Sequence, residues 1–220
     1  MEGQACMRTE RSSILIFIII LFHAVGLAGL SVSFMQPLFL ALVPFHLLLM
    51  LGLLSFSHNT FDLKFIWFVF TIVVLGYAVE WVGIHDHFIF GSYTYGDTLG
   101  YKPGGVPLII GINWFLLVYA SGVFAQRLFV SSVLARIVFG AFIMVMSDVI
   151  IEPIAIRFDY WHWQTAGDFL TAPLINYIGW FVVSLVMLTI FEVFAFKRQS
   201  RVAIALLFAQ ALFFILLYLV

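Results

Sequence analysis

Long apolar runs constrain this sequence more than any other feature. Runs of about 17–25 residues, the length that lets a helix cross a bilayer, recur along all 220 residues. Seven candidate spans lie near residues 12–30, 37–57, 65–84, 106–127, 132–152, 173–195 and 201–220. The sequence therefore predicts an all-α, polytopic membrane helix bundle with about seven transmembrane helices, in a single integral membrane domain over residues 1–220.

Composition supports this class of protein. Hydrophobic residues make up 64% of the chain and charged residues 10%, whereas soluble domains average about 25% charged residues. Only lipid can cover so much apolar surface. The formal net charge of −1 and the lack of a basic run give no indication of a nucleic-acid partner. The single cysteine, Cys6, rules out a disulfide within one chain.

Basic residues indicate the orientation in the membrane. Eight of the ten lysines and arginines fall in the N-terminal tail and in the second, fourth and sixth loops, and the opposite side holds only Lys102 and Arg157. Because basic loops stay on the cytoplasmic side, we expect a multi-pass cell-membrane protein with a cytoplasmic N-terminus and an outside C-terminus. The first run ends in HAVGLAGLS, which is similar to a signal-peptidase site. Its apolar stretch from Ile14 to Leu30 favours an uncleaved first helix.

The acidic residues gather at the predicted outer face. Seven of the eleven lie there: Glu80, Asp86, Asp97, Asp148, Glu152, Asp159 and Asp168. Glu80 and Asp148 lie inside predicted helices, and Glu152 follows Asp148 by one turn on the same face. A carboxylate at this depth is costly unless it faces the bundle interior, and a buried acid beside an apolar substrate suits a proton donor. The alternatives are that Glu152 snorkels to water and that Asp148 bonds a neighbouring helix.

Amide and aromatic side chains extend this set. Asn113 and Asn176 lie in the outer parts of the fourth and sixth spans, where an amide can orient an acid or a water, or join two helices. Five of the six tryptophans lie at the same face: Trp81, Trp114, Trp161, Trp163 and Trp180. They form either an aromatic belt or the wall of a site. The long outer loops 85–105 and 154–172 are typical of loops that cover a site.

The histidines give a weaker signal. His85, His87 and His162 lie in the outer loops, while His23 and His46 are isolated within helices. The sequence lacks the histidine clusters of membrane di-iron oxygenases, so solvated loop histidines are favoured over a metal site. It also lacks a flavin, nicotinamide or haem signature, and we expect no cofactor.

Three segments carry a family resemblance. They read EWVGIHDHFIFGSYTYGDTLGYKPGGVPL from Glu80 to Leu108, SDVIIEPIAIRFDYWHW from Ser147 to Trp163, and PLINYIGW from Pro173 to Trp180. In this order they resemble the carotenoid biosynthesis integral membrane family, whose characterised members are carotenoid 1,2-hydratases, including bisanhydrobacterioruberin hydratases. Relatives typically have Asp-x-x-x-Asp-Pro in the second segment. Here Glu152, one methylene longer, takes the place of the second aspartate.

The resemblance implies a hydro-lyase that adds water to the terminal C1=C2 double bond of an acyclic carotenoid, such as the isoprenoid lycopene. Asp148 would then protonate the alkene, with Glu80 or Glu152 as the partner base, or with these roles exchanged. The predicted substrate-binding residues are Tyr93, Tyr95, Asn113, Trp161, Trp163, Asn176 and Trp180. The implied partners are the carotenoid, membrane lipid and other carotenoid enzymes such as a glycosyltransferase.

Two other functions remain open at this level. An integral membrane lycopene cyclase would form the same carbocation but exclude water from it. A membrane transporter or seven-helix receptor would bind a small ligand without chemistry. Residues 201–220 contain no lysine, which excludes a retinal protein, and the acids crowd one rim, whereas transporters place ionisable residues near the midplane.

Overall fold

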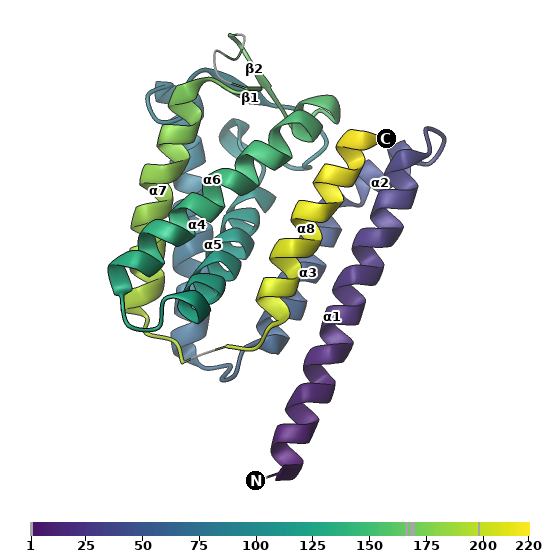
Figure 1. Ribbon diagram of the computed structural model, residues 1–220. Coiled ribbons are helices and arrows are strands. Elements are labelled where there is room, and N and C mark those ends of the chain that lie inside the picture. The colour runs from purple at the N-terminus through teal and green to yellow at the C-terminus, as the bar shows by residue number, and fades with distance from the viewer. Residues whose placement is uncertain (1, 166, 168–169, 198) are drawn as a thin grey trace.

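The apolar runs form helices in the computed structural model, which describes residues 2–165, 167, 170–197 and 199–220. Asp168, counted among the outer acids, lies outside the described residues. The helices of the described chain are α1 (Glu2–Ser31), α2 (Gln36–Ala41), α3 (Val43–Ser57), α4 (Leu63–Asp86), α5 (Ile109–Leu128), α6 (Val133–Arg157), α7 (Leu174–Val193) and α8 (Val202–Leu219), with a short 3-10 helix, η1, at Pro103–Gly105 (Figure 1).

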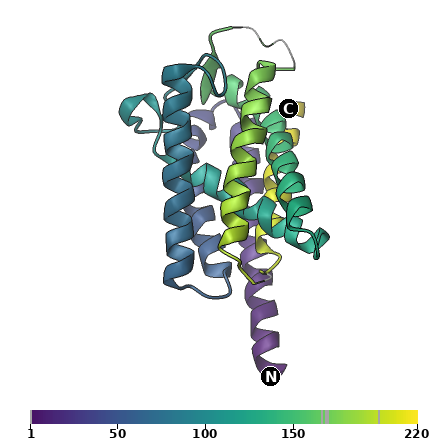
Figure 2. The ribbon, with the colours of Figure 1, turned by 90° about the vertical axis from the view of Figure 1, so that its left-hand side faces the viewer.

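The helices confirm the predicted polytopic bundle. Within the described residues, six helical segments are long and apolar enough to cross a membrane, and the 15-residue α3 is a shorter apolar helix. The start of α1 and the end of α8 lie at opposite ends of the bundle (Figure 1). The first turns of α1 extend beyond the inner end of the other helices (Figure 2). Counted together with α3, these segments make seven helices along the described bundle, an odd number, which fits the opposite positions of the two ends.

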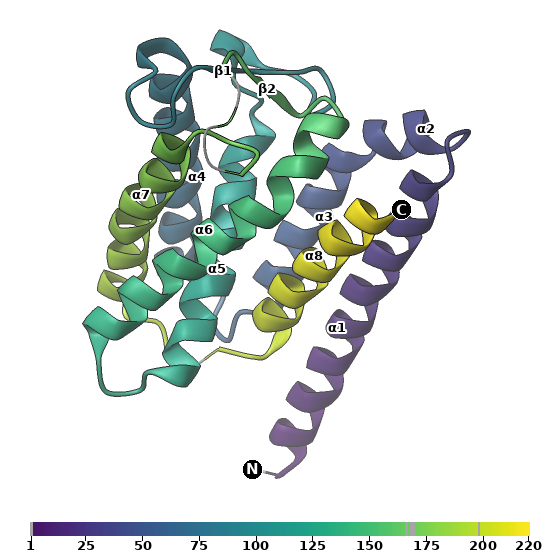
Figure 3. The same cartoon turned by 45° about the horizontal axis from the view of Figure 1, so that its top comes forward.

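The second predicted span, 37–57, is wrong as a single helix. The chain forms α2 up to Ala41, turns at Leu42 and resumes as α3 at Val43. Pro44 lies in the first turn of α3, where its missing N–H is tolerated, but it cannot continue the hydrogen bonds of a preceding helix. The short α2 therefore lies at an angle to α3 at the outer end of the bundle (Figure 3).

Helix α6 also differs from the prediction, because it continues through Pro153 to Arg157. A proline removes one backbone hydrogen bond, but its φ angle is compatible with a helix. The turn that follows is held by packing, since Ile154 is 1% exposed and Ala155 is fully buried. The predicted span 132–152 therefore ended about one turn too early, before Pro153.

Helix α5 is the centre of the bundle and packs against α3, α4, α6, α7 and α8. Its contact with α4 is close because glycines lie on both sides of it, as is common between membrane helices. A Cβ atom on Gly76 of α4 would lie 2.6 Å from Cβ of Trp114, and one on Gly111 of α5 would lie 2.3 Å from the carbonyl oxygen of Val73. This approach brings Glu80 of α4 within hydrogen-bond reach of Trp114 of α5.

The two long outer loops meet in a small antiparallel sheet that the sequence analysis did not predict. Strand β1 (Tyr93–Tyr95) pairs with β2 (Trp161–Trp163), in the register Tyr93 with Trp163, Thr94 with His162 and Tyr95 with Trp161. Side chains alternate across a strand, so the two tyrosines and two tryptophans share one face while Thr94 and His162 lie on the other. The sheet covers the outer end of the bundle (Figures 1 and 3).

The α4–α5 contact yields a stability prediction. Gly111→Ala should lower the free energy of unfolding by about 1–3 kcal/mol, the usual cost of overpacking, because backbone lies against the new methyl group. Gly52→Ala in α3 is the matched control, since nothing lies within 4 Å of its added Cβ, and it should be neutral or stabilising. Thermal unfolding in detergent measures both variants, and equal melting temperatures would contradict the close contact.

Candidate active site

The three acids predicted from the sequence face one small cavity beneath the β1–β2 sheet. Glu80 comes from α4, and Asp148 and Glu152 come from α6; they are 4%, 1% and 1% exposed. The other predicted site residues also line this cavity: Tyr93, Tyr95, Asn113, Trp161, Trp163, Asn176 and Trp180. The structure therefore brings all ten predicted residues together, and their individual roles stay predictions.

Glu80 is held by three hydrogen-bond donors. Its Oε2 atom accepts hydrogen bonds from the hydroxyl groups of Tyr93 and of Tyr95, the latter at 2.8 Å, and its Oε1 atom accepts one from Nε1 of Trp114 at 2.8 Å. Both carboxyl oxygens thus act as acceptors, and the side chain is fixed between α5 and β1. This arrangement suits a positioned acceptor more than a mobile proton donor.

Asp148 and Glu152 have fewer or longer hydrogen bonds. Oδ2 of Asp148 accepts one from Nδ2 of Asn176 at 2.7 Å, and among the described residues Oδ1 has no protein partner. Glu152 accepts longer bonds from the indoles of Trp161 at 3.2 Å and Trp163 at 3.1 Å. The two carboxyl groups lie one turn apart on the same face of α6, as their spacing predicted.

Aromatic rings form most of the remaining wall. The indoles of Trp114 and Trp180 stack with centroids 4.3 Å apart, and Tyr93 lies 5.2 Å from Trp163. The sequence analysis placed Trp114 among the outer tryptophans but missed its bond to Glu80. The position of Trp114 next to Asn113, in an outer turn of the helix, could have indicated that Trp114 belongs to the site. Among the described lining residues there is no lysine or arginine, so no cation neutralises the acids.

A polar cluster on the outside of the sheet fixes the cover of the cavity. Asp159 accepts hydrogen bonds from the backbone N–H of Asp97 at 3.0 Å and from Nε2 of His162 at 2.5 Å. These bonds, the backbone one first, lower the pKa of Asp159. Lys102 pairs with Asp97 at 2.6 Å and donates to the carbonyl oxygen of Tyr95 at 3.0 Å. Loops 85–105 and 154–172 are thereby tied together.

Two of the three outer histidines, His85 and His162, have structural partners. His162 bonds Asp159, and Nδ1 of His85 lies 2.7 Å from the carbonyl oxygen of Trp81, on which its ring stacks. Within the described chain, no three His, Cys, Asp or Glu side chains group closely enough to hold a metal ion.

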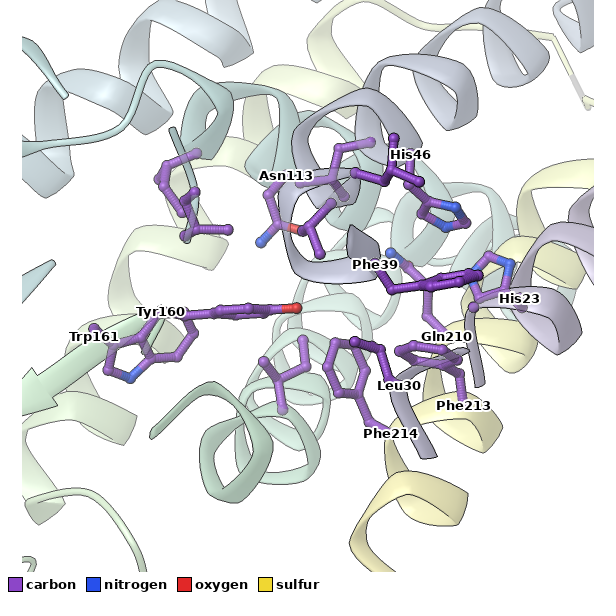
Figure 4. Close-up of a pocket in the computed structure, with 17 residues that line it drawn as sticks. His23, Leu30, Phe39, His46, Asn113, Tyr160, Trp161, Gln210, Phe213 and Phe214 are labelled. Carbon is purple, nitrogen blue, oxygen red and sulfur yellow. The ribbon is translucent and has the colours of Figure 1, made fainter. Parts of the chain in front are cut away.

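A second, mostly apolar cavity lies next to the acid cavity. This groove lies between α1, α2, α3 and α8, and shares four lining residues with the acid cavity: Ile110, Asn113, Ile151 and Trp161. The hydroxyl group of Tyr160 points into it (Figure 4). Leu42, at the break between α2 and α3, lines the groove and is 44% exposed. The groove therefore reaches the lipid-facing surface at this break, and the sequence analysis did not predict it.

The fold and the cavity together define a polytopic membrane protein with carboxyl groups in an aromatic outer chamber. The chain belongs to the carotenoid biosynthesis protein family, whose sequence model matches residues 38–220. It is similar to a bisanhydrobacterioruberin hydratase of Haloarcula japonica, with 26% identity over 133 residues that cover 59% of this chain and 45% of the relative. The match thus spans less than half of that relative. No solved structure matches the chain.

The tyrosines of β1 allow the site to be tested by titration. Burial and then the Glu80 carboxyl raise the pKa of Tyr93 and Tyr95 well above the ordinary value. Below about pH 11, one unit above the usual tyrosine pKa of about 10, neither side chain should ionise. The ultraviolet tyrosinate absorbance of the wild type and of Tyr93→Phe/Tyr95→Phe should therefore rise equally. In denaturant the tyrosinate absorbance of the wild type should exceed that of the variant by the contribution of two tyrosines. A larger absorbance of the wild type already in the folded state would contradict the buried environment of Tyr93 and Tyr95.

Proposed function

We propose that this protein adds water to the terminal C1=C2 double bond of an acyclic carotenoid, as a hydro-lyase that needs no cofactor. The observation that carries the proposal is an apolar groove that shares a wall with a chamber of three buried carboxyl groups, whose described lining residues include no lysine or arginine. Family membership and the similarity to a hydratase support a carotenoid-modifying role. The apolar groove can hold a polyene, and the carboxyl groups can protonate its terminal double bond.

The groove accounts for the position of the substrate. A carotenoid dissolved in the bilayer enters at the break beside Leu42 and lies along the apolar walls. Its terminal isoprene unit passes between Asn113 and Trp161, which line both cavities. The reacting double bond then lies next to the carboxyl groups while the chain stays in apolar surroundings.

Asp148 is the proton donor in this proposal. Asn176 holds its Oδ2 atom, which leaves Oδ1 to carry the proton toward the cavity. Transfer of this proton to C2, the less substituted alkene carbon, places a tertiary carbocation at C1. The indoles of Trp114 and Trp180, which line the cavity, stabilise this cation, and a cation–π contact in a desolvated site is worth about 2 kcal/mol.

Water completes the reaction. A water oriented by Asn113 attacks C1, and Glu152 accepts the proton that this water loses, so a tertiary alcohol forms. Glu80, held by three donors, stays an acceptor that helps to place the water. Return of the proton from Glu152 to Asp148, one turn away on α6, restores the starting state without any redox step.

The first test is production of the alcohol. The protein expressed in a bacterium that makes lycopene or γ-carotene should yield a pigment heavier by one water, as measured by mass spectrometry. A pigment of unchanged mass and shifted absorption would instead indicate a cyclase. Unaltered pigment with several acyclic substrates would contradict both functions.

A second test addresses the proton donor. Asp148→Asn should reduce turnover at least about 100-fold, the usual contribution of a general acid, because the amide has no proton of comparable acidity to give. Asp86→Asn changes an exposed acid at the end of α4 and should leave turnover within about twofold. Both variants must reach the membrane in equal amounts, and substantial activity of Asp148→Asn would exclude it as the donor.

A further inference from the structure

Three polar side chains lie at the end of the groove away from the acid chamber. His23 comes from α1, His46 from α3 and Gln210 from α8, and all three line the groove. They lie at one end of the cavity, while Tyr160 and Trp161 lie at the other (Figure 4). None of them has a part in the proposed reaction.

Polar groups buried among membrane helices are costly unless they find partners. His23 is 6% exposed and its Nδ1 atom lies 2.8 Å from the carbonyl oxygen of Ile19. That contact assigns the proton of the neutral ring to Nδ1 and leaves Nε2 as an acceptor. Its ring lies edge-on to His46, with centroids 4.8 Å apart.

Gln210 provides an independent observation. The side chain is 7% exposed, and its Oε1 atom is buried without a hydrogen-bond partner in the described part of the chain. A buried carbonyl oxygen left without a donor destabilises the folded protein. A ligand that brings a hydrogen-bond donor to this end of the groove would remove that cost.

We infer that His23, His46 and Gln210 form a subsite for a hydroxyl group carried by the polyene substrate, at a distance from the reacting double bond. This inference rests on the proposed function, because it assumes that the reacting end occupies the acid chamber. A hydroxyl group donates one hydrogen bond, to Gln210 Oε1 or His23 Nε2, and accepts another from an imidazole or amide N–H. The three residues thus select among acyclic carotenoids.

The chemistry of the lining excludes other polar groups. A phosphate or carboxylate would be unneutralised, since the described residues that line the groove include no lysine or arginine. A carbonyl group only accepts hydrogen bonds and would leave Gln210 Oε1 without a donor. A pure hydrocarbon would leave all three side chains without ligand partners.

The competing interpretation is that these side chains only join α1, α3 and α8 to one another. Interhelical hydrogen bonds in membranes have this role, and their loss lowers stability whatever the substrate. A subsite instead changes the ratio between substrates. The ratio of kcat/KM for two substrates therefore separates the two interpretations.

The experiment compares lycopene with a monohydroxylated lycopene that keeps one unmodified reacting end. Wild type should prefer the hydroxylated substrate about tenfold in kcat/KM, which is the effect of one well-placed hydrogen bond. Gln210→Leu should remove this preference, because kcat/KM for the hydroxylated substrate should fall about tenfold more than kcat/KM for lycopene. Gln126→Leu is the matched control, because Oε1 of Gln126 is also buried without a partner but the residue does not line the groove.

A binding measurement keeps this inference separate from the proposed reaction. Quenching of tryptophan fluorescence in detergent gives the Kd of both carotenoids without any turnover, and the same tenfold ratio and its loss in Gln210→Leu are expected. Equal Kd values in wild type, or equal effects of Gln210→Leu on both ligands, would overturn the subsite. Selective binding without hydration would support the subsite and contradict the proposed function. His46→Phe repeats the test if Gln210→Leu does not fold.

Discussion

The burial of three carboxyl groups at one end of a lipid-surrounded bundle is the constraint on which the outer half of this molecule depends. No lysine or arginine lines their cavity within the described chain, so hydrogen-bond donors from neutral side chains must offset the cost of burial. Two tyrosines, three tryptophans and one asparagine provide them. The β1–β2 sheet and the close α4–α5 contact bring most of these donors to the acids.

Much of this arrangement could be predicted from the sequence, because lipid imposes the length and polarity of the helices. Six long helices follow from apolar runs, and acids within such runs must face inward, which identified Glu80 and Asp148. The predictions from the sequence were wrong at two prolines, which have different effects on their helices. Pro44 accompanies a break before α3, whereas Pro153 lies within a continuous α6. Tertiary packing of the turn after Pro153 keeps α6 continuous, and the local sequence pattern does not predict this packing.

Two parts of the site could not be predicted from the local sequence. The β1–β2 pairing joins loops that lie about 70 residues apart, and three-residue strands have too few residues to show a period. The groove forms from α1, α2, α3 and α8, whose sequences are almost uniformly apolar. Within the apolar stretches of these helices, His23, His46 and Gln210 were a local indication that the helices line a cavity. Their proximity depends on how the helices pack.

The junction of the two cavities bears on the choice between hydration and cyclisation. A cyclase must fold the polyene back so that an internal double bond reaches the cation before water does, which requires apolar walls around the reacting end. Here the groove is apolar, but the chamber at its end presents oxygen atoms from Glu80, Asp148 and Glu152 and the amide of Asn113 at the entrance. A carbocation formed there lies among groups that bind and deprotonate water. We infer that the polar lining of this chamber fits the proposed capture of the cation by water better than it fits cyclisation.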